Sequence, residues 1–240
     1  MSTFHPPQSI ELVVIIPILL ATLGYLAYWY ISFSPKILKR ISKTSGMLVD
    51  AVKKILFQRL IGILFLGIVP TFITIKFLPF SLKDLGVSFS FNFNTLLWIL
   101  ALSGIVILLS FFSRNSIENL ENYPQIRIPD WDIELIILNI VSWAGFLLAY
   151  EFLFRGILLF PLVETLGIWT SIAINTSLYA LVHFPKGPRE TLGTIPLGIV
   201  LCIATLSTGT IWTAFLVHLL MALSNDYFSI RSHPNYRFVK

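Results

Sequence analysis

The sequence predicts an all-α membrane protein, a polytopic bundle of about seven transmembrane helices. Of its 240 residues, 56% are hydrophobic and only 12% are charged. This charged fraction is roughly half that of a typical soluble domain. Apolar runs of about 20 residues, long enough to cross a bilayer, recur along the chain. Backbone polar groups inside hydrocarbon must be paired within the segment, so these runs favour helices.

Seven apolar segments are expected to form these helices. They are residues 10–33, 61–80, 95–112, 133–162, 169–184, 191–206 and 211–230. No internal repeat or linker divides them, so a single membrane domain is expected over residues 1–240. It would comprise an N-terminal span with a basic interfacial segment over residues 1–60 and a core over residues 133–230. The single cysteine, Cys202, excludes a disulfide framework and a cysteine metal cluster.

The net charge of +5 has its main source in one stretch after the first span. This stretch, "SPKILKRISKTSGMLVDAVKKILFQRL", contains a single acid, Asp50. Because basic excess beside spans marks the cytoplasmic side, we expect this loop and the basic C-terminal tail to be cytoplasmic. The stretch could lie on anionic lipid as an interfacial helix or form a solvated loop. We expect a multi-pass protein of the bacterial cytoplasmic membrane, with the lipid bilayer as partner and no nucleic acid.

Ionisable residues inside a span are costly and are candidate functional residues. Lys76 lies near a span end and can snorkel to the interface, and four others are singled out: Glu151, Arg155, His183 and His218. Glu151 and Arg155 are four residues apart and so can pair on one helix face. That pair could be purely structural, and His183 and His218 could each be a buried core residue. Taken together, a carboxylate and two histidines on three helices can activate water or hold a metal. We therefore expect all four side chains to meet in one polar cavity.

Three motifs containing these residues occur in order: "YEFLFRG", "YALVH" and "STGTIWTAFLVH". Together they resemble the CAAX-protease and bacteriocin-processing family of intramembrane metalloproteases, which includes the type II CAAX prenyl endopeptidases. The family pattern is Glu-Glu-x-x-x-Arg, Phe-x-x-x-His and His-x-x-x-Asn or Asp, and the match covers residues 135–228. The resemblance implies an endopeptidase that hydrolyses a peptide or protein at the membrane with a water activated by glutamate and histidine.

Two polar positions of the family pattern are different in this chain. Tyr150 replaces the first glutamate, and Ala222 replaces the asparagine that follows His218. Asn225 lies almost two turns after His218, on the same helix face, and is expected to supply part of the missing function. Tyr150 is a poor base, with an ordinary pKa of about 10, although it can donate a hydrogen bond. On this basis Tyr150→Phe is expected to retain most activity.

The stretch "HFPKGPRE" offers a second carboxylate, Glu190, after a short Pro-Gly-Pro connection. An acid in the first turn of a helix is also ordinary, because it complements the helix dipole. A bacterial branch of the family pairs an aromatic-Glu-x-x-x-Arg-Gly motif with His-x-x-Lys-x-x-x-Glu, which resembles the pattern here. This resemblance implies that Glu190 is a site residue, and we expect its carboxylate to face His183.

The predicted catalytic residues are therefore Glu151, His183, His218, Glu190, Arg155 and Asn225. His183, His218 and Glu151 could bind zinc, or the same residues could work without metal; there is no His-Glu-x-x-His motif to decide between the two. Two other functions remain open. One is a non-catalytic relative used in bacteriocin self-immunity or as a membrane scaffold, and the other is a small transporter. The sequence does not identify the substrate.

Overall fold

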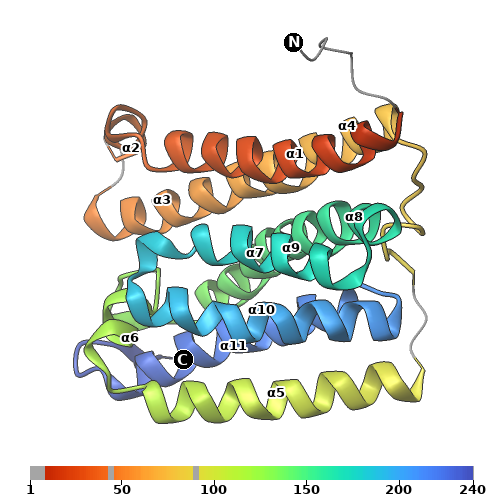
Figure 1. Ribbon diagram of the computed structural model, residues 1–240. Helices are drawn as coiled ribbons and strands as arrows, with labels where there is room; N and C mark the ends of the chain where they lie inside the picture. Colours follow the sequence, from red (N-terminus) through yellow and green to blue (C-terminus); the bar gives the residue numbers. More distant parts are fainter. Residues whose placement is uncertain (1–8, 43–45, 89–91, 240) are drawn as a thin grey trace.

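The computed structural model describes residues 9–42, 46–88 and 92–239, and their secondary structure is almost entirely helical (Figure 1). The α-helices are α1 (Ser9–Ser32), α2 (Pro35–Ile41), α3 (Met47–Gly62), α4 (Val69–Phe77), α5 (Phe93–Ser113), α6 (Ile117–Asn122), α7 (Ile133–Glu151), α8 (Leu159–Leu166), α9 (Ile168–Leu181), α10 (Pro188–Thr208) and α11 (Trp212–Ser232). Two π-helical segments, η1 (Ile63–Ile68) and η2 (Phe152–Leu158), join α3 to α4 and α7 to α8. A 3₁₀ turn, η3 (Phe184–Lys186), follows α9. The strands β1 (Asp130–Trp131) and β2 (Arg237–Phe238) form a short parallel pair.

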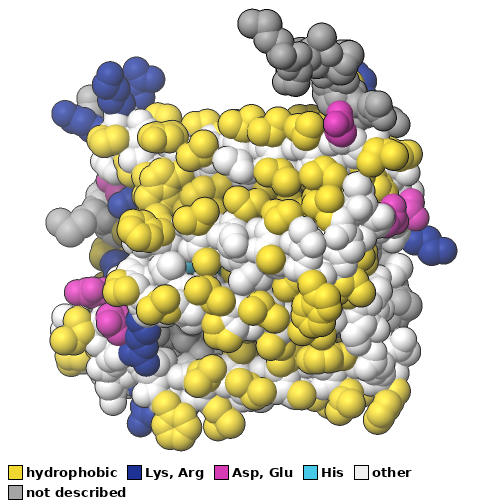
Figure 2. Space-filling view, in the orientation of Figure 1, with side chains coloured by type: hydrophobic (Ala, Val, Ile, Leu, Met, Phe, Trp, Pro, Cys, Tyr) yellow, Lys and Arg dark blue, Asp and Glu magenta, His cyan; other side chains and the backbone are white. Residues whose placement is uncertain are grey.

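The long helices lie side by side as a bundle, with α1 and α3 along one edge and α5 along the other (Figure 1). Helix α7 packs against α3 and α11, α9 packs against α10, and α11 packs along α5. Hydrophobic side chains cover the middle of the face shown in Figure 2, and charged side chains gather at its two ends. This distribution is what a bilayer requires, because the hydrocarbon region excludes charge.

Within the residues that the structure describes, five helical segments are long and apolar enough to cross a membrane: Ile10–Ser32, Leu48–Phe77, Phe93–Ser113, Ile133–Leu166 and Pro188–Thr208. The all-α membrane fold is therefore confirmed, and the expected number of about seven spans is too high by this criterion. Helix α9 has only 14 residues, a length of about 21 Å against about 30 Å of hydrocarbon. Helix α11 is longer but carries polar side chains, including His218, Asn225 and Asp226.

The second long helix begins at Met47, and the predicted start at residue 61 is wrong. The basic segment is therefore not an interfacial helix along its whole length, since its second half is the first half of this helix. Lys53 and Lys54 are exposed on it, whereas Gln58 and Arg59 are buried. Arg59 Nη1 donates to Asn139 Oδ1 at 3.0 Å and to Ser142 Oγ at 2.6 Å. These hydrogen bonds stabilise Arg59 inside the bundle. The helix can therefore include this basic residue, whereas composition alone predicts that the span begins only after it.

Local capping explains where two helices of the core begin and end. Helix α7 begins after Asp132, whose Oδ1 accepts a hydrogen bond from Leu135 N at 2.8 Å. Side-chain acceptors of this kind satisfy the free N–H groups of the first helical turn. Helix α10 ends at Thr208 and is capped by Gly209, which takes the left-handed conformation with φ of 67°. Glycine adopts this conformation without the steric cost that a Cβ atom imposes.

Candidate active site

A buried ion pair lies where α7 passes into η2. Glu151 is the last residue of α7, Arg155 lies in η2, and both are fully buried. Arg155 Nε is 3.4 Å from Glu151 Oε2. Arg155 Nη1 also donates to Asn175 Oδ1, and Asn175 Nδ2 donates to the carbonyl of Phe154. The guanidinium is therefore held from α9 as well as by Glu151.

The other carboxylate oxygen of Glu151 holds His218. His218 Nδ1 is 2.6 Å from Glu151 Oε1. A carboxylate with Arg155 beside it accepts hydrogen bonds, so Nδ1 of His218 carries the proton and donates it. In a neutral His218 ring Nε2 is then unprotonated and available as an acceptor.

His183 is oriented in the same manner by a backbone group. Its Nδ1 is 2.8 Å from the carbonyl oxygen of Tyr179, one turn earlier in α9. A carbonyl can only accept, so Nδ1 of His183 carries the proton and Nε2 is the free acceptor. Tyr150 lies beside the same ring, with its hydroxyl oxygen 3.5 Å from Nδ1. Both histidines thus have one ring nitrogen fixed by the protein and the other available for chemistry.

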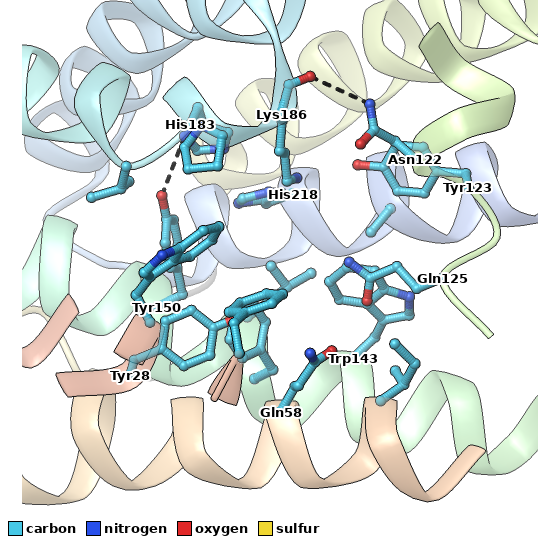
Figure 3. Close-up of a pocket in the computed structure, with 18 of the residues that line it drawn as sticks. Tyr28, Gln58, Asn122, Tyr123, Gln125, Trp143, Tyr150, His183, Lys186 and His218 are labelled. Atoms are coloured by element: carbon cyan, nitrogen blue, oxygen red, sulfur yellow. Dashed lines mark hydrogen bonds between the residues drawn. The ribbon is translucent and has the colours of Figure 1, made fainter. Parts of the chain in front are cut away.

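Two cavities of about 420 Å³ and about 530 Å³ meet at these histidines. Four residues line both cavities: His183, His218, Tyr123 and Lys186. Figure 3 shows the smaller cavity, with Tyr150 pointing toward His183 and the Lys186 side chain reaching toward His218. The structure thus places both histidines in the walls of the same two cavities. Glu151 and Arg155 line neither cavity; Glu151 contacts His218, and Arg155 contacts Glu151. Both volumes fall within the range of about 300–1,000 Å³ that is typical of ligand-binding pockets in proteins.

The short length of α9 brings His183 to the depth of Glu151. Helix α9 ends at Leu181, and His183 just after it is buried, whereas the turn that follows, η3, has no buried residue. The hydroxyl of Tyr150 contacts the His183 ring, and the next residue along α7 holds His218. A straight helix of full membrane length would have carried His183 away from this level.

Glu190 pairs with Lys186 and not directly with His183, while Glu190 and His183 both line the larger cavity. Glu190 Oε2 is 3.3 Å from Lys186 Nζ, and the Glu190 side chain is 27% exposed. No bond joins Glu190 to the His183 ring within residues 92–239, although both line the larger cavity. Lys186 is four residues before Glu190, which is a favourable spacing for an ion pair. The expectation that Glu190 faces His183 overlooked this cation.

The polar residues near the end of α11 divide between two neighbourhoods. Asn225 lines the larger cavity and is hydrogen-bonded to Tyr123. Burial raises the pKa of the Tyr123 hydroxyl, with Lys186 acting in the opposite direction. Asp226 contacts α7 instead, and its Oδ2 accepts from Asn139 at 2.9 Å and from Trp143 at 2.8 Å. Asn225 is therefore close to the cavity, though not at the position of Ala222, which lines the smaller one.

Sequence reasoning missed three residues of this region. Asn175, Lys186 and Tyr123 were not among the predicted site residues. Asn175 could have been found from the sequence. Burying an unpaired side-chain amide in an apolar helix costs free energy, which is the reason for which the other site residues were singled out. Lys186 resembles an ordinary lysine in a turn, and Tyr123 lies in a loop distant in sequence. Only the fold brings these two to the histidines.

The residues present do not fit a three-ligand zinc site. His183 and His218 each have a free Nε2, but one oxygen of Glu151 holds His218 and the other faces Arg155. Catalytic zinc sites ordinarily have three protein ligands and one open position. Throughout residues 9–42, 46–88 and 92–239, no group of three or more His, Cys, Asp or Glu side chains is placed to hold a metal ion.

The fold and the site together define an integral membrane helix bundle with a buried carboxylate–histidine centre. Residues 132–224 match a family model described as "Type II CAAX prenyl endopeptidase Rce1-like". The match contains Glu151, Arg155, His183 and His218, so the family predicted from the motifs is confirmed for the core of the chain. No curated protein and no solved structure matches the chain.

Proposed function

We propose that the protein is an intramembrane endopeptidase that hydrolyses peptide bonds with a water molecule bound between His183 and His218. The observation that carries the proposal is the 2.6 Å hydrogen bond between His218 Nδ1 and Glu151 Oε1. A carboxylate that fixes one ring nitrogen and stabilises the protonated ring makes the other nitrogen an effective general base.

The chemistry follows from the two free Nε2 atoms. Each can accept one hydrogen of the same water, which leaves an oxygen lone pair directed at a substrate carbonyl. When the water oxygen attacks the carbonyl carbon, its proton passes to Nε2 of His218, and the carbonyl oxygen becomes an oxyanion. The protonated His218 is stabilised by Glu151. It then gives the proton to the leaving amine nitrogen as the C–N bond breaks.

Glu151 and Arg155 act as positioning residues in this mechanism. Arg155 keeps the Glu151 carboxylate charged and in place, and Asn175 holds the guanidinium. Rigid support of this kind matters because misplacement of a catalytic group by about 1 Å can cost about 10²-fold in rate. We propose that the reaction needs no metal, since the Glu151 oxygens are already engaged.

The two cavities favour a peptide substrate that reaches the site from the membrane. The larger cavity is walled on one side by apolar residues of α5 and α10, including Leu102, Val106, Leu197 and Val200. The smaller cavity has more polar walls, with Gln58, Asn122 and Gln125 around it (Figure 3). A peptide with an apolar segment on one side of the cleaved bond suits this pair of cavities. The basic excess of the stretch after α1 supports a cytoplasmic position for that end of the bundle, in the bacterial cytoplasmic membrane that we propose for the protein.

The test is cleavage of internally quenched peptides of random sequence by the wild-type protein and Glu151→Gln in proteoliposomes. Glu164→Gln is the matched control, because it makes the same exchange at an exposed position of the same long helical segment. We expect the wild-type protein and Glu164→Gln to cleave and Glu151→Gln to lose cleavage. A folded wild-type protein that cleaves none of the peptides would instead support the scaffold or immunity function, for which Ala222 is the structural argument.

A further inference from the structure

Tyr150 occupies a place in the site that the mechanism above leaves unused. It is buried, lines the smaller cavity, and points its hydroxyl toward His183 (Figure 3). Its ring centroid is 6.1 Å from the His183 ring and 5.7 Å from the His218 ring, and it stands nearly perpendicular to both. The Tyr150 ring therefore packs against both histidines, and its hydroxyl lies beside His183 at the wall of the cavity.

The protonation of His183 determines what this hydroxyl can do. Because His183 Nδ1 donates its proton to the Tyr179 carbonyl at 2.8 Å, it has no lone pair to offer Tyr150. The 3.5 Å contact can therefore only be one in which the Tyr150 oxygen accepts. In residues 9–42, 46–88 and 92–239, no other partner of the Tyr150 hydroxyl is found within hydrogen-bond distance. Its O–H is thus free to donate into the cavity.

We propose that the Tyr150 hydroxyl donates a hydrogen bond to the oxyanion formed on the substrate carbonyl. This inference rests on the proposed endopeptidase function. Water attack breaks the carbonyl π bond and places a negative charge on the carbonyl oxygen, and the Tyr150 O–H stabilises that charge without transferring its proton. When the C–N bond breaks, the carbonyl re-forms and the hydrogen bond weakens.

The neighbouring residues support this assignment. Ala222 lines the same cavity and offers no donor, and the Lys186 ammonium is engaged by Glu190 at 3.3 Å. A donor that strengthens its hydrogen bond only as charge develops accelerates the chemical step without tightening substrate binding. The role differs from the minor one expected from the sequence, in which Tyr150 was a poor base able to donate a hydrogen bond and Tyr150→Phe kept most activity.

The experiment compares the wild-type protein, Tyr150→Phe, Glu151→Gln and Tyr227→Phe in proteoliposomes. Tyr227→Phe is the matched control, since it removes the same hydroxyl from a half-exposed side chain that lines neither cavity. Peptide cleavage gives kcat and KM separately. Binding of a phosphinic peptide, whose tetrahedral anion imitates the intermediate, is measured by calorimetry on the same samples. Circular dichroism checks that each variant is folded.

We expect Tyr150→Phe to lower kcat by about 10²- to 10³-fold, as for removal of one oxyanion donor, with little change in KM. Affinity for the phosphinic peptide should fall along with kcat, and Tyr227→Phe should resemble the wild-type protein. An active Tyr150→Phe with unchanged phosphinic-peptide affinity, beside an inactive Glu151→Gln, would overturn the role of Tyr150 alone. A wild-type protein without peptidase activity would overturn both this role and the proposed function.

Discussion

Glu151 and Arg155 form a fully buried ion pair. Because water does not screen the pair, its interaction free energy should be large enough to measure with a double-mutant cycle. Glu151→Gln leaves the Arg155 charge buried without its counter-charge, and Arg155→Gln does the same to Glu151. Removal of one partner from a buried pair typically costs about 3–5 kcal/mol of stability. The double variant leaves no charge, so we expect it to lose about 0.5–3 kcal/mol less than the sum of the two single losses.

The assay is the free energy of unfolding in detergent micelles, followed by circular dichroism for the wild-type protein, both single variants and the double variant. The control cycle uses Lys186 and Glu190, a partly exposed pair at the same spacing, for which we expect a coupling of about 0–1 kcal/mol. The double variant should lose less stability than the two single losses added together, and it should remain inactive because His218 still lacks its carboxylate. Strictly additive losses at Glu151 and Arg155 would refute the pairing, and a recovered activity would refute the role of Glu151.

Two further predictions concern packing and metal. Gly24→Ala should destabilise the protein by about 1–3 kcal/mol, because a Cβ there would lie 2.6 Å from the backbone oxygen of Phe65. Gly104→Ala, with nothing within 4 Å, should be neutral or stabilising, and equal thermal unfolding of the two variants would contradict the close contact. Peptide cleavage should persist in 1,10-phenanthroline, and a loss that added zinc restores would show that a metal is required.

The fold was largely predictable because hydrocarbon imposes a strong constraint on a chain. Apolar length alone predicted helices close to α1, α5, α10 and α11, with ends shifted by a few residues. The long helix that begins at Met47 was not predictable, because Arg59 is tolerated inside the bundle through partners distant in sequence, Asn139 and Ser142 on α7 and Gln125 in the loop before it. Nor does a pattern of nearly uniform apolar residues distinguish α-helical from π-helical turns, so η1 and η2 had no signal.

The site was predictable in part, and for a related reason. Glu151, Arg155, His183 and His218 stood out because each is costly in an apolar span, and such residues need partners. The sequence could not say which partners they take. Glu190 was assigned to His183 on the basis of a short connection, whereas the fold places it against Lys186. Distances across the turn depend on where α9 ends, and helix ends are the least certain feature of a sequence-based prediction.

The central claim is that a water molecule held by His183 and His218 hydrolyses a peptide bond, and oxygen labelling tests it most directly. The wild-type protein, His218→Gln and Glu164→Gln are reconstituted in H₂¹⁸O with the quenched peptides, and the products are analysed by mass spectrometry. We predict one ¹⁸O atom in the new carboxyl group for the wild-type protein and Glu164→Gln, and no product from His218→Gln. Products from His218→Gln at the wild-type rate, or a folded wild-type protein that forms none, would contradict the claim.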